Sequence, residues 1–258
     1  MTLKNAVVTG ANRGLGLEIC KQLLEKKEYQ RVFAICRSTS PDLKALEKDE
    51  KLQIIDNIQV MDHADTATRL TDYFQSTQLE PIPIHLLIHN AGAYGPSEGF
   101  SSFNEERHSQ GIATITPERI RFAFELNTAA PLFITQALLS NLRAAAPEAK
   151  VAIISSAMGS ISNNTSGEHY AYRASKAAVN MVGKGLAVDL SKDQIAVGLI
   201  HPGFVFTGFG NIKERIEGQR DVDESAKGVL DAVDCINLNN TGCFLHGNYG
   251  EGVKLMEW

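Results

Sequence analysis

Two side chains capable of acid–base chemistry lie four residues apart in this sequence. Tyr172 and Lys176 fall in the run Tyr-Ala-Tyr-Arg-Ala-Ser-Lys that starts at Tyr170. The run reads as a helix, and residues four apart share one helix face. A lysine ammonium stabilises phenolate, so the pair predicts a tyrosine pKa below its usual value of about 10. Such a phenol can pass a proton to or from an oxygen atom. The spacing alone also fits an ordinary surface pair, so the rest of the sequence is needed to distinguish a catalytic pair from a surface pair.

A glycine-rich turn follows the first apolar segment of the chain. The run Thr-Gly-Ala-Asn-Arg-Gly-Leu-Gly ends at Gly16, between a predicted strand at 6–9 and a predicted helix at 15–27. Glycines allow a tight turn in which backbone N–H groups approach a pyrophosphate, and the helix N-terminus adds its positive dipole end. The alternative is a tight turn without a ligand. We predict a dinucleotide site that includes Gly10, Asn12, Arg13, Gly14, Leu15 and Gly16.

The residue after the second predicted strand (31–36) bears on the choice of cofactor. A carboxylate at this place would hold the ribose 2′-hydroxyl of NAD, whereas an arginine suits a 2′-phosphate. The strand ends in Cys-Arg-Ser with Arg37 and no acid, and Arg13 adds a second cation from the glycine turn. Arginine offers a planar fork for phosphate oxygens. We therefore predict NADP(H) over NAD(H), the alternative being that both arginines are plain surface residues.

Apolar strand-like runs alternate with longer helical patterns along the whole chain. The remaining strands are expected at 52–60, 85–89, 150–155, 196–200 and 242–246, and the remaining helices at 42–51, 66–75, 117–146, 170–190 and 223–237. Strands separated by helices need crossover connections, which build a parallel sheet covered on both faces. No repeat or linker interrupts the pattern, so we predict one doubly wound, Rossmann-type α/β domain over residues 1–258.

Composition excludes several classes of function. A net charge of −5 over 258 residues argues against nucleic acid as a main partner. No apolar run reaches the length of about 18 residues that a membrane span needs, and the N-terminus does not resemble a signal peptide. The cysteines show no zinc-ligand spacing, so we predict no metal site and reduced thiols in a cytoplasmic protein; they are Cys20, Cys36, Cys235 and Cys243.

Further motifs lie in the order and context of a known family. Besides the glycine turn and Tyr-x-x-x-Lys, they are Asp62 after the third strand, Asn90-Ala-Gly92 after the fourth, Asn127 in the long helix, Ser156 after the fifth strand and Pro202-Gly-Phe-Val-Phe-Thr207 after the sixth. Over nearly its whole length the chain resembles the short-chain dehydrogenase/reductase family. Met158-Gly-Ser-Ile, His201-Pro-Gly and the final Trp258 resemble its C-factor/sniffer-like carbonyl reductase branch. His89 and Gly208 depart from the common family pattern.

The resemblance implies a fold and a cofactor site. The family has one doubly wound domain with a seven-stranded parallel sheet. By resemblance, Asp62 contacts the adenine and Thr207 contacts the nicotinamide amide. Tyr172 lies beside the nicotinamide, and Lys176 also holds its ribose. The other positions implied to contact the cofactor are Asn90, Ala91, Gly92, Pro202, Gly203 and Val205.

The resemblance also implies NADPH-dependent reduction of an aldehyde or ketone. Tyr172 would donate the proton, Lys176 would lower its pKa, and Ser156 would hold the carbonyl oxygen. Asn127 would bind a water that links Lys176 to solvent. Ser155 is the alternative serine, because a shift of one residue in a strand reverses the face. We interpret Lys184 as a solvated surface residue and His201 as a structural residue.

Other readings stay open at this point. A non-catalytic, NADP(H)-sensing regulatory protein could use the same fold, whereas an extended epimerase or dehydratase would need a larger substrate domain. Loops 93–116 and 203–221 are expected to cover the substrate with Tyr94, Phe204, Phe206 and Phe209. Family analogy predicts a homo-oligomer, with a monomer as the alternative. The carbonyl substrate and the physiological direction are not fixed by the sequence.

Overall fold

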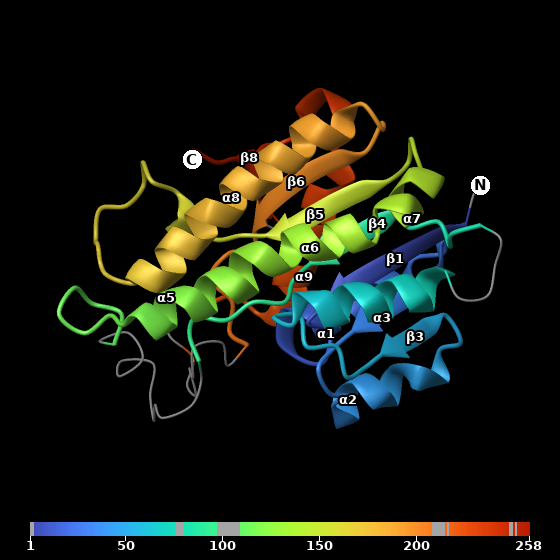
Figure 1. Cartoon of the computed structure of the whole chain (residues 1–258), viewed down its shortest axis with the longest axis horizontal. Coiled ribbons are helices and arrows are strands. Elements are labelled where there is room, and N and C mark those ends of the chain that lie inside the picture. The colour runs from blue at the N-terminus through green and yellow to red at the C-terminus, as the bar shows by residue number, and fades with distance from the viewer. Residues whose placement is uncertain are drawn as a thin grey trace.

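One continuous sheet forms the centre of the molecule (Figure 1). The computed structural model describes residues 3–75, 80–96, 109–207, 215, 217–247, 250 and 252–258. The described strands follow the order β3-β2-β1-β4-β5-β6-β7-β8, and all neighbours are parallel except β7 and β8. Their bounds are β1 Lys4–Thr9, β2 Tyr29–Ile35, β3 Leu52–Ile55, β4 Leu86–His89, β5 Lys150–Ile154, β6 Ala196–His201, β7 Cys243–His246 and β8 Lys254–Leu255. The predicted seven parallel strands are confirmed, and the two-residue β8 adds an antiparallel edge.

Helices cover both faces of this sheet (Figure 1). On one face lie α1 (Gly14–Glu25) and α9 (Val222–Cys235), with the short α2 (Pro41–Lys44) beside them. On the other lie α3 (His63–Gln75), the segmented α5–α7 and the long α8 (Tyr170–Ser191). The strands are buried on both sides. In β1, for example, Ala6 and Val8 pack in the hydrophobic core beneath α1 and α9, and Val7 packs in the core beneath α3, α6 and α8. This double burial explains why the strands read as continuous apolar runs.

The predicted helix at 117–146 is not continuous. It consists of α5 (Pro117–Phe124), a π-helical turn η2 (Glu125–Ala129), α6 (Ala130–Ala137) and α7 (Leu139–Ala144). Leu138 separates the last two segments with ψ near 12°. Single-turn π-bulges inside α-helices often lie at functional sites. Here the bulge contains Asn127. Shorter 3₁₀ segments are η1 (Ala45–Lys48), η3 (Ala157–Gly159) and η5 (Leu238–Asn240).

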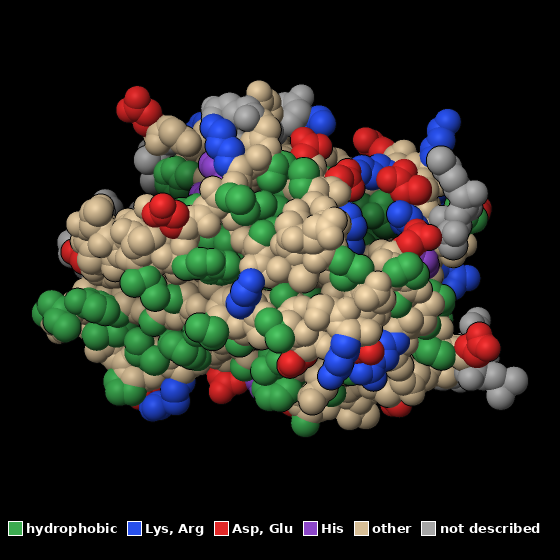
Figure 2. Space-filling view, turned by 90° about the horizontal axis from the view of Figure 1, so that it is seen from above, with side chains coloured by type: hydrophobic (Ala, Val, Ile, Leu, Met, Phe, Trp, Pro, Cys, Tyr) green, Lys and Arg blue, Asp and Glu red, His purple; other side chains and the backbone are tan. Residues whose placement is uncertain are grey.

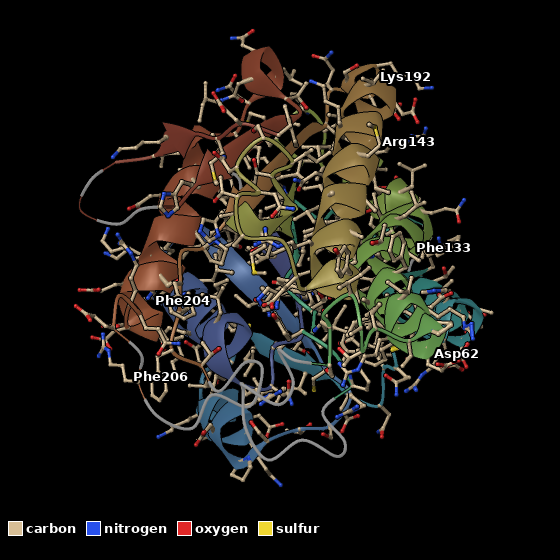
Figure 3. The ribbon with its side chains drawn as sticks, turned by 90° about the vertical axis from the view of Figure 1, so that its left-hand side faces the viewer. Asp62, Phe133, Arg143, Lys192, Phe204 and Phe206 are labelled. Atoms are coloured by element: carbon tan, nitrogen blue, oxygen red, sulfur yellow. The ribbon has the colours of Figure 1, made fainter. Side chains whose placement is uncertain are left out.

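The parallel strands bring the predicted site residues to one edge. β1 leads into α1 on one face, whereas its neighbour β4 leads toward α5 on the other, so the connections diverge between these two strands. In open α/β sheets ligands bind at such a switch point, outside the carboxyl ends of the strands. Figure 3 looks toward this carboxyl edge, with Phe204 and Phe206 of the segment after β6 on one side and Asp62 on the other.

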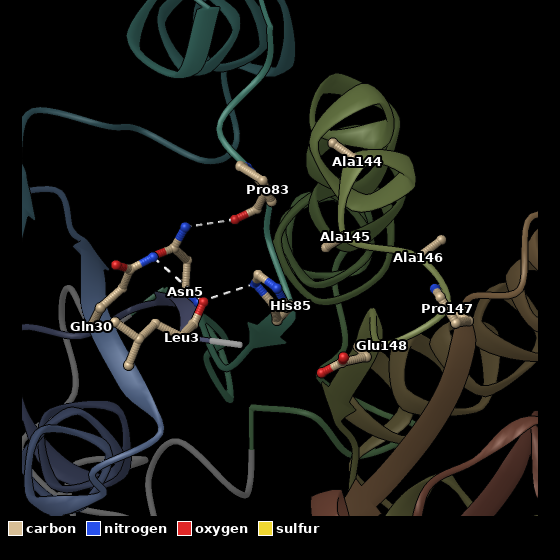
Figure 4. Close-up of a pocket in the computed structure, with 10 residues that line it drawn as sticks. All are labelled: Leu3, Asn5, Gln30, Pro83, His85, Ala144, Ala145, Ala146, Pro147 and Glu148. Carbon is tan, nitrogen blue, oxygen red and sulfur yellow. Dashed lines mark hydrogen bonds between the residues drawn. The ribbon is translucent and has the colours of Figure 1, made fainter. Parts of the chain in front are cut away.

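The opposite, amino edge of the sheet holds a cavity of about 570 Å³ (Figure 4). Its wall includes Asn5 at the start of β1 and His85 just before β4, facing small residues that follow α7. The Asn5 N–H donates to His85 Nδ1 over 3.1 Å, and the Asn5 side chain donates to the Pro83 carbonyl over 2.8 Å. Burial lowers the pKa of His85. These groups tie loop backbone to the ends of the strands.

Candidate active site

The glycine turn closes tightly against the end of β4. Gly10 and Gly14 have left-handed backbones, with φ of 67° and 54°. At Gly16 a Cβ would lie 2.3 Å from the Gly10 carbonyl oxygen and 2.4 Å from Asn90 Nδ2. That Nδ2 also donates to the carbonyls of Thr9 and Gly10, at 3.1 and 3.2 Å. Side chains at these positions would therefore open the turn, whereas glycine leaves room for backbone N–H groups to face a ligand.

The turn presents positive potential to the solvent. The first turn of α1 contains no acidic residue, so its dipole is not neutralised there. Arg13 precedes this helix and Arg37 follows β2, and both side chains are exposed. Neither guanidinium has a hydrogen-bond or ion-pair partner within the described residues. Asn12 lies between them and accepts a hydrogen bond from Ser40 Oγ through its carbonyl, at 2.5 Å. The two cations are thus available to an anionic group at this edge.

The segment after β6 reaches the same turn. A Cβ on Gly14 would lie 3.1 Å from the Thr207 Cβ, so Thr207 closes over the glycine turn. Val205 forms an isolated bridge with Arg220, and the Pro202 carbonyl accepts a hydrogen bond from Ser225 at 2.7 Å. The structure therefore brings the Pro-Gly segment, the glycine turn and Ala91, which a Cβ on Gly10 would meet at 2.8 Å, into one crevice.

Asp62 has a local structural role. Its Oδ1 accepts a hydrogen bond from the Asp65 N–H at 3.1 Å, immediately before the start of α3. This is the usual contact of a helix-capping aspartate. The side chain is exposed, and Figure 3 shows it on the far side of the edge from Phe204 and Phe206. An adenine contact for Asp62 stays a prediction.

The two serines after β5 point to different partners. Ser155 Oγ donates to Asn180 Oδ1 in the buried interior at 2.5 Å. Ser156 Oγ accepts from the Met158 N–H at 3.1 Å and shares a hydrogen bond with the Tyr172 phenol. Because the Ser155 hydroxyl is committed to α8, the geometry favours Ser156 as the serine that faces the reacting group.

The pKa of Tyr172 differs from the prediction. Burial raises it from 10 to about 12, and the hydrogen bond with Ser156 opposes this only in part. The predicted pKa below 10 is therefore wrong: the Lys176 ammonium donates to the Ile154 carbonyl at 2.8 Å and lies 5.8 Å from the centre of the tyrosine ring, so its stabilisation of the phenolate does not offset burial. Loss of water around the phenol therefore outweighs the nearby positive charge.

Lys176 is itself a costly group at this place. Only 5% of the residue is exposed, and no carboxylate within the described part of the chain lies within ion-pair distance. Burial lowers its pKa from 10.5 to about 8. An ammonium with this pKa remains mostly charged at neutral pH. A buried lysine without an acidic partner is uncommon, and such perturbed groups cluster at functional sites.

Asn127 holds the floor of the site from the π-helical turn. Its Nδ2 donates to the Ala93 carbonyl at 2.9 Å and to Ser175 Oγ at 3.1 Å, and its Oδ1 accepts from the Ala93 N–H at 3.0 Å. Gly92 fits between this side chain and Lys176, because its Cβ would lie 3.1 Å from Asn127 Oδ1 and 3.7 Å from Lys176 Nζ. Both amide hydrogens are engaged, so a water could bind only through an oxygen of this residue.

The predicted substrate-covering aromatics are only partly described. Tyr94 is buried, with its ring 5.0 Å from that of Tyr172, so it packs against the phenol as a wall. Phe204 is 45% exposed, and Phe206 pairs through its backbone with Arg220. Phe209 lies outside the described residues, as do 97–108 and 208–214 of the two loops. Lys184 is exposed, and His201 is half-buried with its ring stacked 4.9 Å from that of His246.

A family model described as short chain dehydrogenase matches residues 4–217. This span contains the glycine turn, the serine after β5, the tyrosine–lysine pair and the Pro-Gly segment. The chain belongs to the short-chain dehydrogenase family. Members of this family are nicotinamide-dependent oxidoreductases, which agrees with the predicted class of reaction.

Solved structures and a curated relative indicate which branch of the family this chain resembles. An NADPH-bound carbonyl reductase from chicken fatty liver is 29% identical, with a TM-score of 0.81 and full coverage of both chains. The carbonyl reductase Sniffer of D. melanogaster is 26% identical, with a TM-score of 0.83 and full coverage of both. The C-signal protein of Myxococcus xanthus is 33% identical over 63% of this chain and 87% of its own. The resemblance to the C-factor/sniffer-like branch is thus confirmed.

Sequence reasoning missed two polar residues that shape this short-chain dehydrogenase site. Thr9 Oγ1 accepts hydrogen bonds from the N–H groups of Asn90 and Ala91, each at 3.1 Å, and so joins β1 to the turn after β4. A hydroxyl at the last position of an apolar strand was the available signal. Gln110 contacts the start of α8 and gave no signal, because it is one polar residue in a long polar loop.

No helix within the described residues is long and apolar enough to cross a membrane.

Proposed function

We propose that this protein is an NADPH-dependent reductase of aldehydes or ketones. The observation that carries the proposal is the convergence of Ser156, Tyr172 and Lys176 in a buried position at the carboxyl edge of the sheet. The glycine turn lies at the same edge. A phenol, a hydroxyl and an unneutralised ammonium at the mouth of a nucleotide crevice are suited to protonating an oxygen that gains negative charge.

The crevice fits a dinucleotide that carries an additional phosphate. Gly10, Gly14 and Gly16 form a turn that side chains would fill, and the α1 N-terminus above it has no acid in its first turn. Arg37 occupies the position after β2 where a 2′-phosphate is held, and Arg13 lies nearby on the turn. The NADPH-bound carbonyl reductase from chicken supports the same choice for this chain. When bound, NADPH supplies the hydride.

Tyr172 is the proton donor in the proposed reaction. Its pKa of about 12 keeps the phenol protonated at neutral pH, so the proton is present when the substrate arrives. As negative charge develops on the carbonyl oxygen, Tyr172 would give that oxygen its phenol proton, which would complete the alcohol and leave a tyrosinate. Ser156 donates a hydrogen bond to that oxygen, a contact that contributes about 3 kcal/mol in comparable sites.

Lys176 acts on the tyrosinate that remains. Its ammonium lies in a low-dielectric surrounding and stabilises the negative phenolic oxygen, which burial alone would disfavour. A proton from solvent, passed by way of Lys176 and a water near Asn127, restores the phenol. The pKa of about 8 suits the lysine to this exchange near neutral pH.

Consumption of NADPH with a panel of carbonyl compounds tests the proposal. The panel contains aliphatic and aromatic aldehydes, cyclic ketones and α-dicarbonyls, with the wild-type chain and the Ser156→Ala variant assayed in parallel. We expect turnover of at least one class and a decrease of about 100-fold in the variant. A wild-type chain that binds NADPH with micromolar affinity but reduces none of these compounds would instead favour the cofactor-sensing alternative.

The proposal includes assembly into a homo-oligomer. Apolar side chains are exposed along α6 and α8, at Leu132, Phe133, Met181 and Val188. Hydrophobic side chains also gather on the face seen in Figure 2. Sedimentation velocity of the wild-type chain and of a Met181→Lys variant tests the assembly. The wild type should sediment as a dimer or tetramer and the variant as a smaller species, whereas a wild-type monomer would refute it.

A further inference from the structure

The helix that carries Tyr172 begins in a strained conformation. Gly167, Glu168 and His169 all have positive φ angles, of 63°, 54° and 53°, directly before the first residue of α8. Left-handed backbone at the two non-glycine positions costs about 1–3 kcal/mol each and persists only when surrounding contacts hold it. His169 stands at the capping position with no side-chain hydrogen bond to the helix. Arg173 of α8 donates to the Gly167 carbonyl and to Ser166 Oγ, at 3.1 and 2.8 Å, and so holds the preceding loop, but no side chain at the capping position satisfies the first N–H groups of the helix.

Gln110 supplies the missing cap from a different part of the chain. Its carbonyl accepts a hydrogen bond from the Tyr170 N–H at 3.2 Å, and its Oε1 accepts one from the Tyr172 N–H at 3.1 Å. Both donors belong to the first turn of α8, whose N–H groups have no partner within the helix. Gln110 is fully buried. Gln110 thus satisfies two donors of the first turn, one of which is the N–H of the phenol-bearing residue itself.

The same side chain connects the helix to the segment after β4. Gln110 Nε2 donates to the Tyr94 carbonyl at 2.9 Å. The Tyr94 ring lies between two rings of the helix start, 5.0 Å from Tyr172 and 5.2 Å from His169. Two residues before Tyr94, Gly92 packs against Asn127 and Lys176. The Gln110 amide therefore closes a ring of contacts around the phenol, made of the segment after β4, the π-helical turn and the first turns of α8.

We propose that Gln110 is a positioning residue for the reaction: it fixes the Tyr172 backbone so that the phenol stays aligned with Ser156. This inference rests on the proposed function. Without the cap, the first turn of α8 can fray or shift toward relief of the strain at 168 and 169. Because misplacement of a catalytic group by about 1 Å can lower the rate about 100-fold, the turnover number should respond while the distant phosphate contacts do not.

Three variants separate this role from a general loss of stability. Gln110→Met keeps the length of the side chain but removes both of its hydrogen bonds. Gln110→Glu keeps the acceptor for the Tyr172 N–H and loses the donor to Tyr94. Asn141→Leu is the matched control, since Asn141 is an equally buried amide whose Nδ2 donates to a loop carbonyl, that of Ile82, at 3.0 Å at the other edge of the sheet. Each variant is measured for kcat, for the KM of NADPH and for backbone amide exchange.

Gln110→Met should lower kcat about 10- to 100-fold with an unchanged KM for NADPH, and it should speed amide exchange only at 170–173. Gln110→Glu should turn over faster than Gln110→Met, and Asn141→Leu should keep the wild-type kcat. An unchanged kcat in Gln110→Met, an equal loss in Asn141→Leu, or faster exchange throughout the chain would each overturn the proposal. If the wild type reduces no carbonyl, the proposed function fails, whereas the exchange at 170–173 still reports whether Gln110 caps α8.

Discussion

The amino and carboxyl edges of the sheet both bury polar side chains, but in different ways. At the amino edge, Asn5, His85 and Asn141 are neutral groups whose hydrogen bonds go to loop backbone. At the carboxyl edge, a buried ammonium has only the Ile154 carbonyl as a described partner, and a buried phenol has a strongly raised pKa. The amino edge thus buries neutral groups that are mostly satisfied by hydrogen bonds to backbone, with Asn5 Oδ1 left without a partner among the described residues.

This difference separates groups that maintain the fold from groups that serve a reaction. Burying a charge without an opposite charge costs free energy, and strained backbone adds to the cost. At the carboxyl edge both occur together, at Lys176 and at the residues before α8. Variants of the phenol, the hydroxyl and the ammonium at the carboxyl edge should therefore change turnover more than stability, and variants at the amino edge should do the reverse.

The largest expected effect comes from Tyr172→Phe. Removal of the proton donor should lower kcat by about 100- to 10,000-fold, the usual contribution of a general acid. The binding of NADPH and the thermal midpoint should change little, because the ring and its contact with Tyr94 are kept. Stopped-flow hydride transfer and NADPH titration measure the two quantities separately. Turnover within a few-fold of the wild type would remove Tyr172 from the mechanism.

Acidification should destabilise the protein through two histidines at the carboxyl edge, the buried His89 and the half-buried His201. Burial lowers the pKa of His89 to about 3, and burial with nearby His246 and Arg220 lowers that of His201 to about 3. As pH falls below the unfolded value near 6.5, the unfolded chain takes up protons that the folded chain refuses, so the free energy of unfolding falls. At pH 4.5 the loss should be about 2–3 kcal/mol per histidine.

Urea unfolding at pH 7 and pH 4.5 checks this dependence, with His89→Asn as the comparison. The asparagine variant should lose about 2–3 kcal/mol less than the wild type between the two values of pH. An identical loss in both chains would mean that His89 is not held neutral by the fold.

Arg37→Asp should weaken NADPH binding about 10- to 100-fold, which corresponds to the loss of one charge-assisted contact of about 1.5–3 kcal/mol. NADH binding should improve, because a carboxylate at this position suits a ribose 2′-hydroxyl. Arg31→Asp, at an exposed site within β2, serves as the matched control. Isothermal titration with both cofactors measures the ratio, and an unchanged preference for NADPH would place the 2′-phosphate elsewhere.

The smallest effect is expected at the amino edge. Asn5→Leu removes the donor to the Pro83 carbonyl and should lower the free energy of unfolding by about 1–2 kcal/mol while kcat stays at the wild-type value. Urea unfolding and steady-state assays on the same preparation check both parts. A large loss of turnover in this variant would end the proposed division between the two edges.

Much of the fold could be predicted because its signals are local. Apolar runs bounded by glycines and helical periodicity located the strands and helices to within a few residues. The break in the predicted helix at 117–146 had a local signal in Pro131, which lacks an N–H and stands at the start of α6 directly after the π-helical turn. What the sequence could not show is that Asn127 in this turn bonds to Ala93, which is remote in sequence. The two-residue β8 is too short to leave a pattern.

The candidate site likewise contains some features that the sequence predicts and others that depend on the fold. Tyr172, Lys176 and the glycine turn were visible as spacings within one element. The sign of the Tyr172 pKa shift was not, because it depends on burial by Tyr94 and other distant segments. Asp62 caps the start of α3, a contact that the spacing of the motif did not reveal, and its predicted contact with adenine remains a prediction. Gln110 acquires its importance only through the fold, which brings it to the start of α8.

The most direct test of the central claim is a crystal structure of the protein with NADP⁺ and an alcohol product. We expect the pyrophosphate on the glycine turn and the 2′-phosphate beside Arg37. The Tyr172 Oη should lie within about 2.6–3.2 Å of the alcohol oxygen, whose carbon contacts nicotinamide C4. A nicotinamide bound out of reach of Tyr172, or a nucleotide bound in the amino-edge cavity, would contradict the proposed mechanism.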